Sequence, residues 1–279
     1  MSKYLAFGEN MISLARPRVM GILNVTPDSF SDGGRFASRE GALAHARRMV
    51  ADGADIVDIG GESTRPGALP VPEAVELDRV LPLIEALASE GIPVSVDTVK
   101  PSVMRAAMAA GAGMVNDVRA LQDIGGLEAV ATGRAAVCLM HMQGEPRTMQ
   151  AQPHYGDVVR EVGDFLVARA RACEAAGIRR DRIVVDPGFG FGKTMAHNLA
   201  LLRGLGALVA AGYPVLVGLS RKSMLGTITG RDADERVAAS VAAALAAVAR
   251  GASIVRVHDV RETVDALKVW HAVDSVGFG

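Results

Sequence analysis

Residues 55–97 read DIVDIGGESTRPGALPVPEAVELDRVLPLIEALASEGIPVSVD, and this stretch decides the fold prediction. Two short apolar runs, 55–59 and 93–97, flank a segment at 72–89 that has a helical pattern and is closed by Gly91. Both runs are nearly continuous in hydrophobicity instead of alternating, which is typical of parallel strands buried on both faces. The stretch therefore predicts a strand, a helix and a second strand parallel to the first.

The same unit recurs along the whole chain. The predicted strands are Val19–Val25, Asp55–Ile59, Pro93–Asp97, Met114–Val118, Ala136–His141, Ile183–Asp186, Val215–Leu219 and Ser253–His258. Such alternation admits a closed barrel or a doubly wound open sheet. We predict one (β/α)8 TIM barrel domain over residues 1–279, because polar residues end most strands instead of gathering at one switch point. The length is close to the roughly 250 residues typical of this fold.

Helix start and stop signals fill the intervals between the strands. Ser38 is a predicted N-cap and Asp52-Gly53 ends that helix, while Pro101 stands at the first turn of another. Four further helices are predicted at Asp157–Ala176, Asn198–Ala211, Ala233–Ala249 and Glu262–Ala272. The segment Ile124–Thr132 is short and interrupted by glycine, so its helical signal is the weakest.

The overall composition limits the class of partner. Hydrophobic residues make up 49% of the chain, enough for a large core, and the formal net charge is -1. This balance gives no electrostatic footprint for nucleic acid or for an anionic membrane. We therefore expect small-molecule substrates, with no nucleic-acid or membrane partner.

Cysteine use and the apolar runs bear on the cellular compartment. Cys138 and Cys173 have no partner motif, so a reduced cytoplasmic location is predicted. The N-terminal residues lack the uninterrupted apolar core of a signal peptide. The longest apolar run, 237–249, is shorter than the ~18 residues of a membrane span and fits a buried barrel helix.

Polar residues stand at the carboxyl ends of nearly all predicted strands. They are Asn24, Asp58, Asp97, Asn116, His141, Asp186, Ser220-Arg221-Lys222, Arg256 and His258. Any one of them could be a helix cap or a turn residue. Buried carboxylates and amides are costly without partners, so a convergent set indicates a dense internal network or a polar ligand at the barrel mouth.

Four of these residues have complementary hydrogen-bonding chemistry. Asp97 and Asp186 accept when ionised, Asn116 both donates and accepts, and Lys222 only donates. The edge of an aminopyrimidinone ring carries an amino group, a ring N–H and a carbonyl, so it can form hydrogen bonds with this combination of acceptors and donors.

Three other strand-end residues are suited to binding charged groups. Arg256 and His258 are two residues apart on one strand, so both side chains point to the same side and could face an anion. A salt bridge to a neighbouring carboxylate is the structural alternative for this pair. Asn24 could ligate a hard cation or bind a phosphate oxygen.

A glycine-rich stretch, 186–194, has the sequence DPGFGFGKT. It is not a P-loop, because GxxxxGK[ST] would need glycine where Pro187 stands. We predict instead a tight loop that aims Asp186 and exposes Phe189 or Phe191 to a flat ligand, the alternative being a turn with buried phenylalanines.

Two other loops, 24–34 and 60–67, combine hydroxyl groups, glycines, a proline and charged residues. Such loops can bind an anion through backbone N–H groups and Arg65, and can close over a site to exclude water. Ordinary surface loops are the alternative.

At these residues the chain resembles the dihydropteroate synthase family, the sulfonamide targets of folate biosynthesis. The matching segments run in the family's order: MGILNVTPDSFSDGG (20–34), DIGGESTRPG (58–67), SVDT (95–98), VNDV (115–118), LMHMQG (139–144), DPGFGFGK (186–193), GLSRK (218–222) and RVHDV (256–260). The resemblance therefore covers nearly the whole chain. It implies condensation of 6-hydroxymethyl-7,8-dihydropterin diphosphate with p-aminobenzoate to give 7,8-dihydropteroate and diphosphate.

The resemblance also implies roles for individual residues. Asp97, Asn116, Asp186 and Lys222 would hold the pterin ring, with Met140 and Gly218 in the pocket walls. Asn24, Arg256 and His258 would bind the diphosphate, and Asn24 would also ligate Mg²⁺. Phe30, Thr64, Arg65, Pro66, Phe191 and Lys222 would shape the p-aminobenzoate pocket. A homodimer is implied by the family alone.

A dissociative, SN1-like path fits these roles, because the dihydropterin can delocalise positive charge while cations absorb the charge that develops on the diphosphate. Asp97, Asp186, Lys222, Arg256 and His258 are then the candidate catalytic residues. Two alternatives stay open: a pterin-binding methyltransferase that acts on a corrinoid, and a non-catalytic paralogue that binds pterins or proteins.

Overall fold

Eight parallel strands form a ring in the computed structural model, which describes residues 4–25, 34–63, 69–145 and 148–275. The strands are β3 (Arg18–Asn24), β4 (Ile56–Gly60), β5 (Val94–Asp97), β6 (Met114–Asp117), β7 (Ala136–Met140), β8 (Ile183–Asp186), β9 (Leu216–Val217) and β10 (Ile254–Val257). Their order is β8-β7-β6-β5-β4-β3-β10-β9. A parallel bridge between Val185 and Val215 joins the two outer strands. The predicted (β/α)8 barrel is confirmed.

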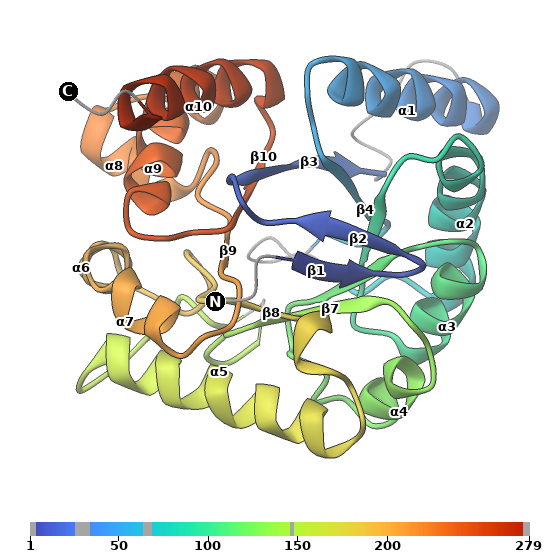
Figure 1. The fold of residues 1–279 in the computed structure, drawn as a ribbon, viewed down its shortest axis with the longest axis horizontal. Coiled ribbons are helices and arrows are strands. Elements are labelled where there is room, and N and C mark those ends of the chain that lie inside the picture. Colours follow the sequence, from blue (N-terminus) through green and yellow to red (C-terminus); the bar gives the residue numbers. More distant parts are fainter. Residues whose placement is uncertain (1–3, 26–33, 64–68, 146–147, 276–279) are drawn as a thin grey trace.

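Helices surround this ring (Figure 1). They are α1 (Gly34–Ala51), α2 (Glu73–Ser89), α3 (Pro101–Ala109), α4 (Gly126–Ala131), α5 (Val158–Ala175), α6 (Met195–Arg203), α7 (Leu205–Ala210), α8 (Ser223–Thr229), α9 (Val237–Val248) and α10 (Val260–Ser275). Asp157 caps α5 by accepting from the backbone N–H groups of Val159 and Arg160, each at 3.1 Å. No helix among the described residues has both the length and the apolar character that a membrane crossing requires.

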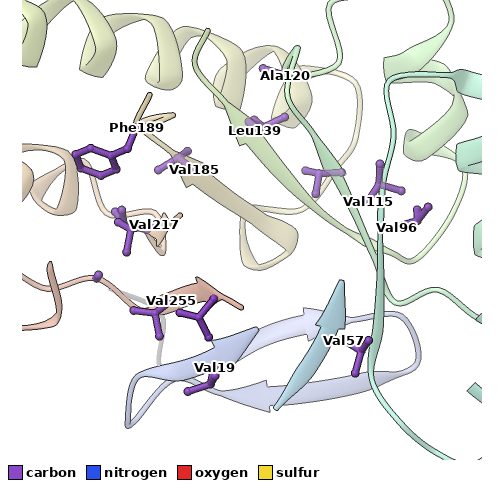
Figure 2. Packing of buried hydrophobic residues seen from close by; sticks show 14 of the residues in the cluster. Val19, Val57, Val96, Val115, Ala120, Leu139, Val185, Phe189, Val217 and Val255 are labelled. Carbon is purple, nitrogen blue, oxygen red and sulfur yellow. The ribbon is translucent and has the colours of Figure 1, made fainter. Parts of the chain in front are cut away.

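The strands are buried on both faces because each contributes to two cores. At least one residue of every barrel strand belongs to the large core shared with the helices, and Figure 2 shows several of them: Val19, Val57, Val96, Val115, Leu139, Val185, Val217 and Val255. Their chain neighbours on most strands form a second core inside the ring, with Met20, Ile56, Met114, Cys138, Val184, Leu216 and Ile254. Apolar residues on both sides explain the continuous hydrophobic runs of the sequence.

An antiparallel hairpin, β1 (Tyr4–Phe7) and β2 (Asn10–Ser13), lies across one end of the ring in Figure 1. Leu5 and Phe7 belong to the inner core. The Phe7 ring packs so closely on Gly113 that a Cβ there would come within 2.2 Å of the ring. The amino-terminal end of the barrel is therefore closed by apolar side chains, and a polar site is left for the other end.

Several sequence predictions were wrong in detail. The hairpin and α8 were not predicted, because each is a short segment without a full helical or strand period. The first helix begins at Gly34, so Ser38 lies within it instead of capping it. The helix predicted over 198–211 is two helices that meet at Gly204, where a side chain would collide with Val159 of α5. The helix predicted from residue 233 begins only at Val237, after a 3-10 turn.

The hairpin seal makes a prediction about stability. Phe7→Ala should lower the free energy of unfolding by about 3–5 kcal/mol, because it opens a cavity in the inner core. Urea unfolding followed by circular dichroism measures the change. Met11→Ala in the same hairpin is the matched control, since Met11 is 55% exposed. Equal, small losses in both variants would show that the hairpin does not seal the barrel.

Candidate active site

The polar strand ends converge on the carboxyl end of the barrel because neighbouring strands run in register. Gly60 is paired with Asp97, Asp97 with Asn116, and Met140 with Asp186. The side chains of a β-strand alternate between its two faces. Asp58, Asp97, Asn116, Asp186 and Arg256 each stand two residues after an inner-core or inward position on their strand, so all belong to the inner face. The sequence prediction that these strand ends share one mouth is confirmed.

Arg256 is the centre of the polar network at this mouth. Its Nε donates to Oδ2 of Asp58 at 2.6 Å, and its Nη2 donates to Oδ2 of Asp97 at 2.8 Å. Asn116 Nδ2 donates to the same oxygen of Asp58 at 3.1 Å. One guanidinium therefore links β10 to β4 and β5. The salt bridge considered as an alternative for Arg256 is the arrangement seen here.

Asp58 has a larger part in this network than its sequence position suggested. Its side chain is 0% exposed, and Oδ1 has no hydrogen-bond partner among the described residues. The inner-face position of Asp58, two residues before the end of β4, was the signal in the sequence. An acid there cannot reach solvent and needs a cation from another strand, and that cation comes from a distant part of the chain.

Burial sets the electrostatics of the mouth. It raises the pKa of Asp97 to about 7, with Arg256 opposing the rise and Asp58 adding to it. Burial acts in the opposite direction on Arg256, but Asp58 and Asp97 outweigh it and raise the pKa of the guanidinium above its usual value. The cation at the centre is thus permanent, while proton binding by Asp97 is finely balanced.

Asp186 stands at the start of the glycine-rich loop. Its Oδ1 accepts from the backbone N–H of Gly188 at 2.7 Å. Burial raises the pKa of Asp186 to about 6, whereas this N–H group and Lys222 lower it. The predicted role of the loop in aiming Asp186 is consistent with this bond.

The loop needs glycine at specific positions. Gly188, Gly190 and Gly192 all have positive φ, at 67°, 80° and 61°. A Cβ on Gly188 would lie 2.0 Å from the carbonyl oxygen of His141, and one on Gly192 would lie 2.4 Å from that of Gln143. The loop is therefore pressed against the segment that follows β7.

The two phenylalanines of the loop have different surroundings. Phe191 is half-buried and lies under the Lys222 ammonium, with Nζ 4.3 Å from the ring centre. Phe189 is only 1% exposed and belongs to the core between strands and helices. The prediction that Phe189 could meet a flat ligand is wrong, because its side chain points away from the mouth.

His258 and Ser220 join the ends of β10 and β9. The Ser220 hydroxyl oxygen accepts from the backbone N–H of His258 at 3.2 Å and lies 3.0 Å from its Nδ1. The next residue, Arg221, has a positive φ of 58° and forms an ion pair with Asp259 at 2.5 Å. Ser220 and Arg221 thus fix the segment that carries Lys222.

Met140 and Gly218, the residues predicted to form pocket walls, leave room beside this network. Met140 is buried at the end of β7. A Cβ on Gly218 would meet no heavy atom within 4 Å, so open space lies beside this residue.

Asn24 is the sequence candidate for a metal ligand. It is half-buried at the end of β3, and a Cβ on Gly60 would lie 3.7 Å from Asn24 Oδ1 and 3.9 Å from Asp97 Oδ2. Two oxygen donors therefore border the same space. Over the ranges that the structure describes, no group of three or more His, Cys, Asp or Glu residues could hold a metal ion. The donors present fit a Mg²⁺ that takes its other ligands from water and a substrate.

Four of the predicted site residues, Phe30, Thr64, Arg65 and Pro66, lie outside the described residues. At the base of the second loop, Glu62 accepts from the backbone N–H of Val71 at 3.0 Å and pairs with Lys100, which also pairs with Glu76. These ion pairs were not predicted, because nothing in the local pattern links residue 100 to this loop.

Comparisons with family models, with related sequences and with solved structures all point to the same family. A model described as pterin binding enzyme matches residues 20–258. The dihydropteroate synthase of Neisseria meningitidis serogroup C is 54% identical over 271 residues, covering 95% of this chain and 96% of the relative. The Xanthomonas albilineans dihydropteroate synthase with 4-aminobenzoic acid superposes with a TM-score of 0.94 at 56% identity, covering 99% of this chain and 100% of that one. The Burkholderia cenocepacia dihydropteroate synthase complexed with 7,8-dihydropteroate superposes with a TM-score of 0.89 at 54% identity, covering 98% and 96%.

The network around Arg256 generates a prediction about proton binding. Asp58→Asn should lower the pKa of Asp97 by about one unit, because it removes a neighbouring negative charge and leaves the guanidinium to Asp97. Carbon-13 NMR titration of the carboxyl groups measures the shift. Asp55→Asn is the matched control, since Asp55 pairs with Arg16 and Arg18 just before the other end of the same strand. An unchanged Asp97 titration in Asp58→Asn would contradict the coupling.

Proposed function

The chain belongs to the pterin-binding enzyme family, among its dihydropteroate synthases, and we infer that the strand ends of the barrel divide that reaction between them. A dihydropteroate synthase joins 6-hydroxymethyl-7,8-dihydropterin diphosphate to p-aminobenzoate and releases diphosphate. The observation that carries the inference is the junction of Asp58, Asp97, Asn116 and Arg256 at one buried mouth. It gathers acceptors, a donor amide and a permanent cation where a substrate with both a pterin and a diphosphate could be held.

We assign the pterin ring to Asp97, Asn116, Asp186 and Lys222. The two carboxylates accept from the amino and ring N–H groups, while the Asn116 amide and the Lys222 ammonium can donate to ring acceptors. Strongly shifted pKa values are typical of functional sites, and burial raises the pKa of both Asp97 and Asp186. Met140 and Gly218 are assigned to the walls, and the open space beside Gly218 supports this.

The diphosphate is assigned to Asn24, Arg256 and His258. In the structure Arg256 is committed to Asp58 and Asp97. A diphosphate would share the guanidinium with these carboxylates, and the charge that they hold in place would face the leaving group. Bound Mg²⁺, for which Asn24 is the proposed protein ligand, would supply further positive charge to the diphosphate oxygens.

The proposed chemistry is a dissociative substitution. The bond between the pterin methylene carbon and the diphosphate oxygen breaks, and its electron pair leaves with diphosphate. Asp97 and Asp186 favour the resulting cation. The arylamine nitrogen then forms the new C–N bond and loses a proton, which the released diphosphate can take up. The neutral amine needs no strong base before it attacks.

We assign p-aminobenzoate to Phe191 and Lys222, together with Phe30, Thr64, Arg65 and Pro66, which lie outside the described residues. The contact of Lys222 with the Phe191 ring supports this assignment. Such a pair offers an apolar surface to the aromatic ring of the amine and a cation near its carboxylate.

A homodimer and a cytoplasmic location also remain proposals. Exposed apolar side chains on α8 and α10, namely Ile228, Val269 and Val273, are candidates for contact with a second copy. Cys138 and Cys173 are buried and unpaired, which suits a reducing compartment.

The reaction itself is tested by product formation. Purified protein with Mg²⁺ and the pterin diphosphate should form 7,8-dihydropteroate and release diphosphate when p-aminobenzoate is present, as followed by chromatography and a coupled diphosphate assay. Absence of both products at full substrate occupancy would overturn the assignment. Transfer of a methyl group from methyltetrahydrofolate to a corrinoid would support the methyltransferase instead, and tight pterin binding without turnover would support the non-catalytic paralogue.

The division of roles predicts that variants of Asp97 and Arg65 impair the binding of different substrates. Asp97→Asn should weaken pterin diphosphate binding by about a hundredfold, because the pterin loses a charged acceptor at a buried site. Arg65→Ala should raise the KM for p-aminobenzoate at least tenfold while changing pterin affinity by less than about threefold. Isothermal titration and steady-state kinetics measure the two effects. Equal losses for both substrates in either variant would contradict its assigned role.

A further inference from the structure

Lys193 ends the glycine-rich loop and has no part in the assignments above. Its side chain is only 3% exposed and lies behind the loop, between the loop and the end of β7. Burial lowers the pKa of Lys193 to about 7. Burying an ammonium costs free energy, so this position calls for contacts that an apolar side chain could not make.

The ammonium is held by carbonyl groups and one imidazole. Nζ donates to the carbonyl oxygens of Gly188 and Phe191, both at 2.9 Å, and to that of His141 at 3.3 Å. It also lies 3.0 Å from Nδ1 of His141. Burial lowers the pKa of His141 to about 3, so the ring is neutral and accepts at Nδ1. One side chain thus ties two loop carbonyls to β7.

The two loop residues held by Lys193 are those that present groups to the mouth. Gly188 donates its N–H to Asp186 at 2.7 Å, and Phe191 places its ring 4.3 Å from the Lys222 ammonium. Gly188 is fixed a second time, because its backbone is pressed against the His141 carbonyl. Among the described residues, the backbone of Phe191 has one other bond, from its N–H to the Gly188 carbonyl at 3.1 Å, within the same loop. The position of Phe191 therefore depends on Lys193 more than that of Gly188 does.

We propose that Lys193 is a positioning residue for the second substrate: by binding the Phe191 carbonyl from behind, it holds the Phe191 ring against Lys222 and shapes the arylamine pocket. This rests on the proposed assignment of p-aminobenzoate to Phe191 and Lys222. Lys193 does not touch the substrates, and it acts through the loop backbone.

The test is a comparison of the two Michaelis constants. Lys193→Met keeps an unbranched side chain only one atom shorter but removes every donor. The KM for p-aminobenzoate should rise about tenfold or more, since charged hydrogen bonds to the loop are lost. The KM for the pterin diphosphate should change by less than about threefold, because Asp97 and Asn116 are untouched and Gly188, which donates to Asp186, stays pressed against the His141 carbonyl.

Tyr155→Phe is the matched control, because Tyr155 lies outside the glycine-rich loop and also bonds to its backbone. The Tyr155 hydroxyl donates to the carbonyl oxygen of Gly192, the residue next to Phe191, at 2.9 Å. This variant loses one bond to the loop but keeps both bonds from Lys193, so the KM for p-aminobenzoate should stay within about twofold of the wild type.

A second substitution at the same position tests whether misfolding explains the result. Lys193→Gln keeps one donor group, and it should show the same split between substrates with a smaller rise in the KM for p-aminobenzoate. Circular dichroism melting confirms that each variant is folded. Equal rises in both Michaelis constants, an unchanged KM for p-aminobenzoate, or a Tyr155→Phe variant as impaired as Lys193→Met would overturn the proposal. Failure of the proposed function would look different, since the wild-type protein would then form no dihydropteroate.

Discussion

The ion pairs of Arg256 with Asp58 and Asp97 are the interaction on which the mouth of the barrel depends. A guanidinium at the inner face of β10 reaches carboxylates on β4 and β5, at 2.6 and 2.8 Å. Removing one partner of such a buried pair leaves an uncompensated charge, which is far costlier than the pair itself is stabilising. The three side chains therefore constrain one another, and the residues of neighbouring strands must fit around them.

The division of the barrel interior into an apolar end and a polar end follows from the alternation of side chains along the strands. On β4 the inner face carries Ile56 and then Asp58, and on β10 it carries Ile254 and then Arg256. The hairpin covers the apolar end with Leu5 and Phe7, which pack in the inner core. Within the part of the chain that the structure describes, the inner face can then meet a ligand at its polar end, where burial raises the pKa of Asp97 and Asp186.

Much of the fold was predictable because it depends on local periodicity. The strand Ile183–Asp186 was predicted to the residue, and the barrel strands lie within two residues of their predicted bounds. The members of the site were predictable as a set, since strand ends in a barrel share one mouth. Their pairing was not: Arg256 bonds to Asp58 across 198 residues, and no local pattern chooses between a salt bridge and a ligand. The role of Lys193 could not be predicted either, because most of its acceptors are backbone carbonyls, which every residue possesses.

The arrangement of charge suits a substrate that carries two different groups. In the structure Asp97 pairs with Arg256, and its carboxylate also borders the space beside Gly60. A diphosphate alone would draw on the guanidinium and leave Asp97 with less compensation, while a pterin alone would add donors to a carboxylate that is already paired. A molecule with both groups supplies an anion to Arg256 and N–H donors to Asp97 together. On the proposed roles, the network would therefore favour the intact pterin diphosphate over a pterin or a diphosphate alone.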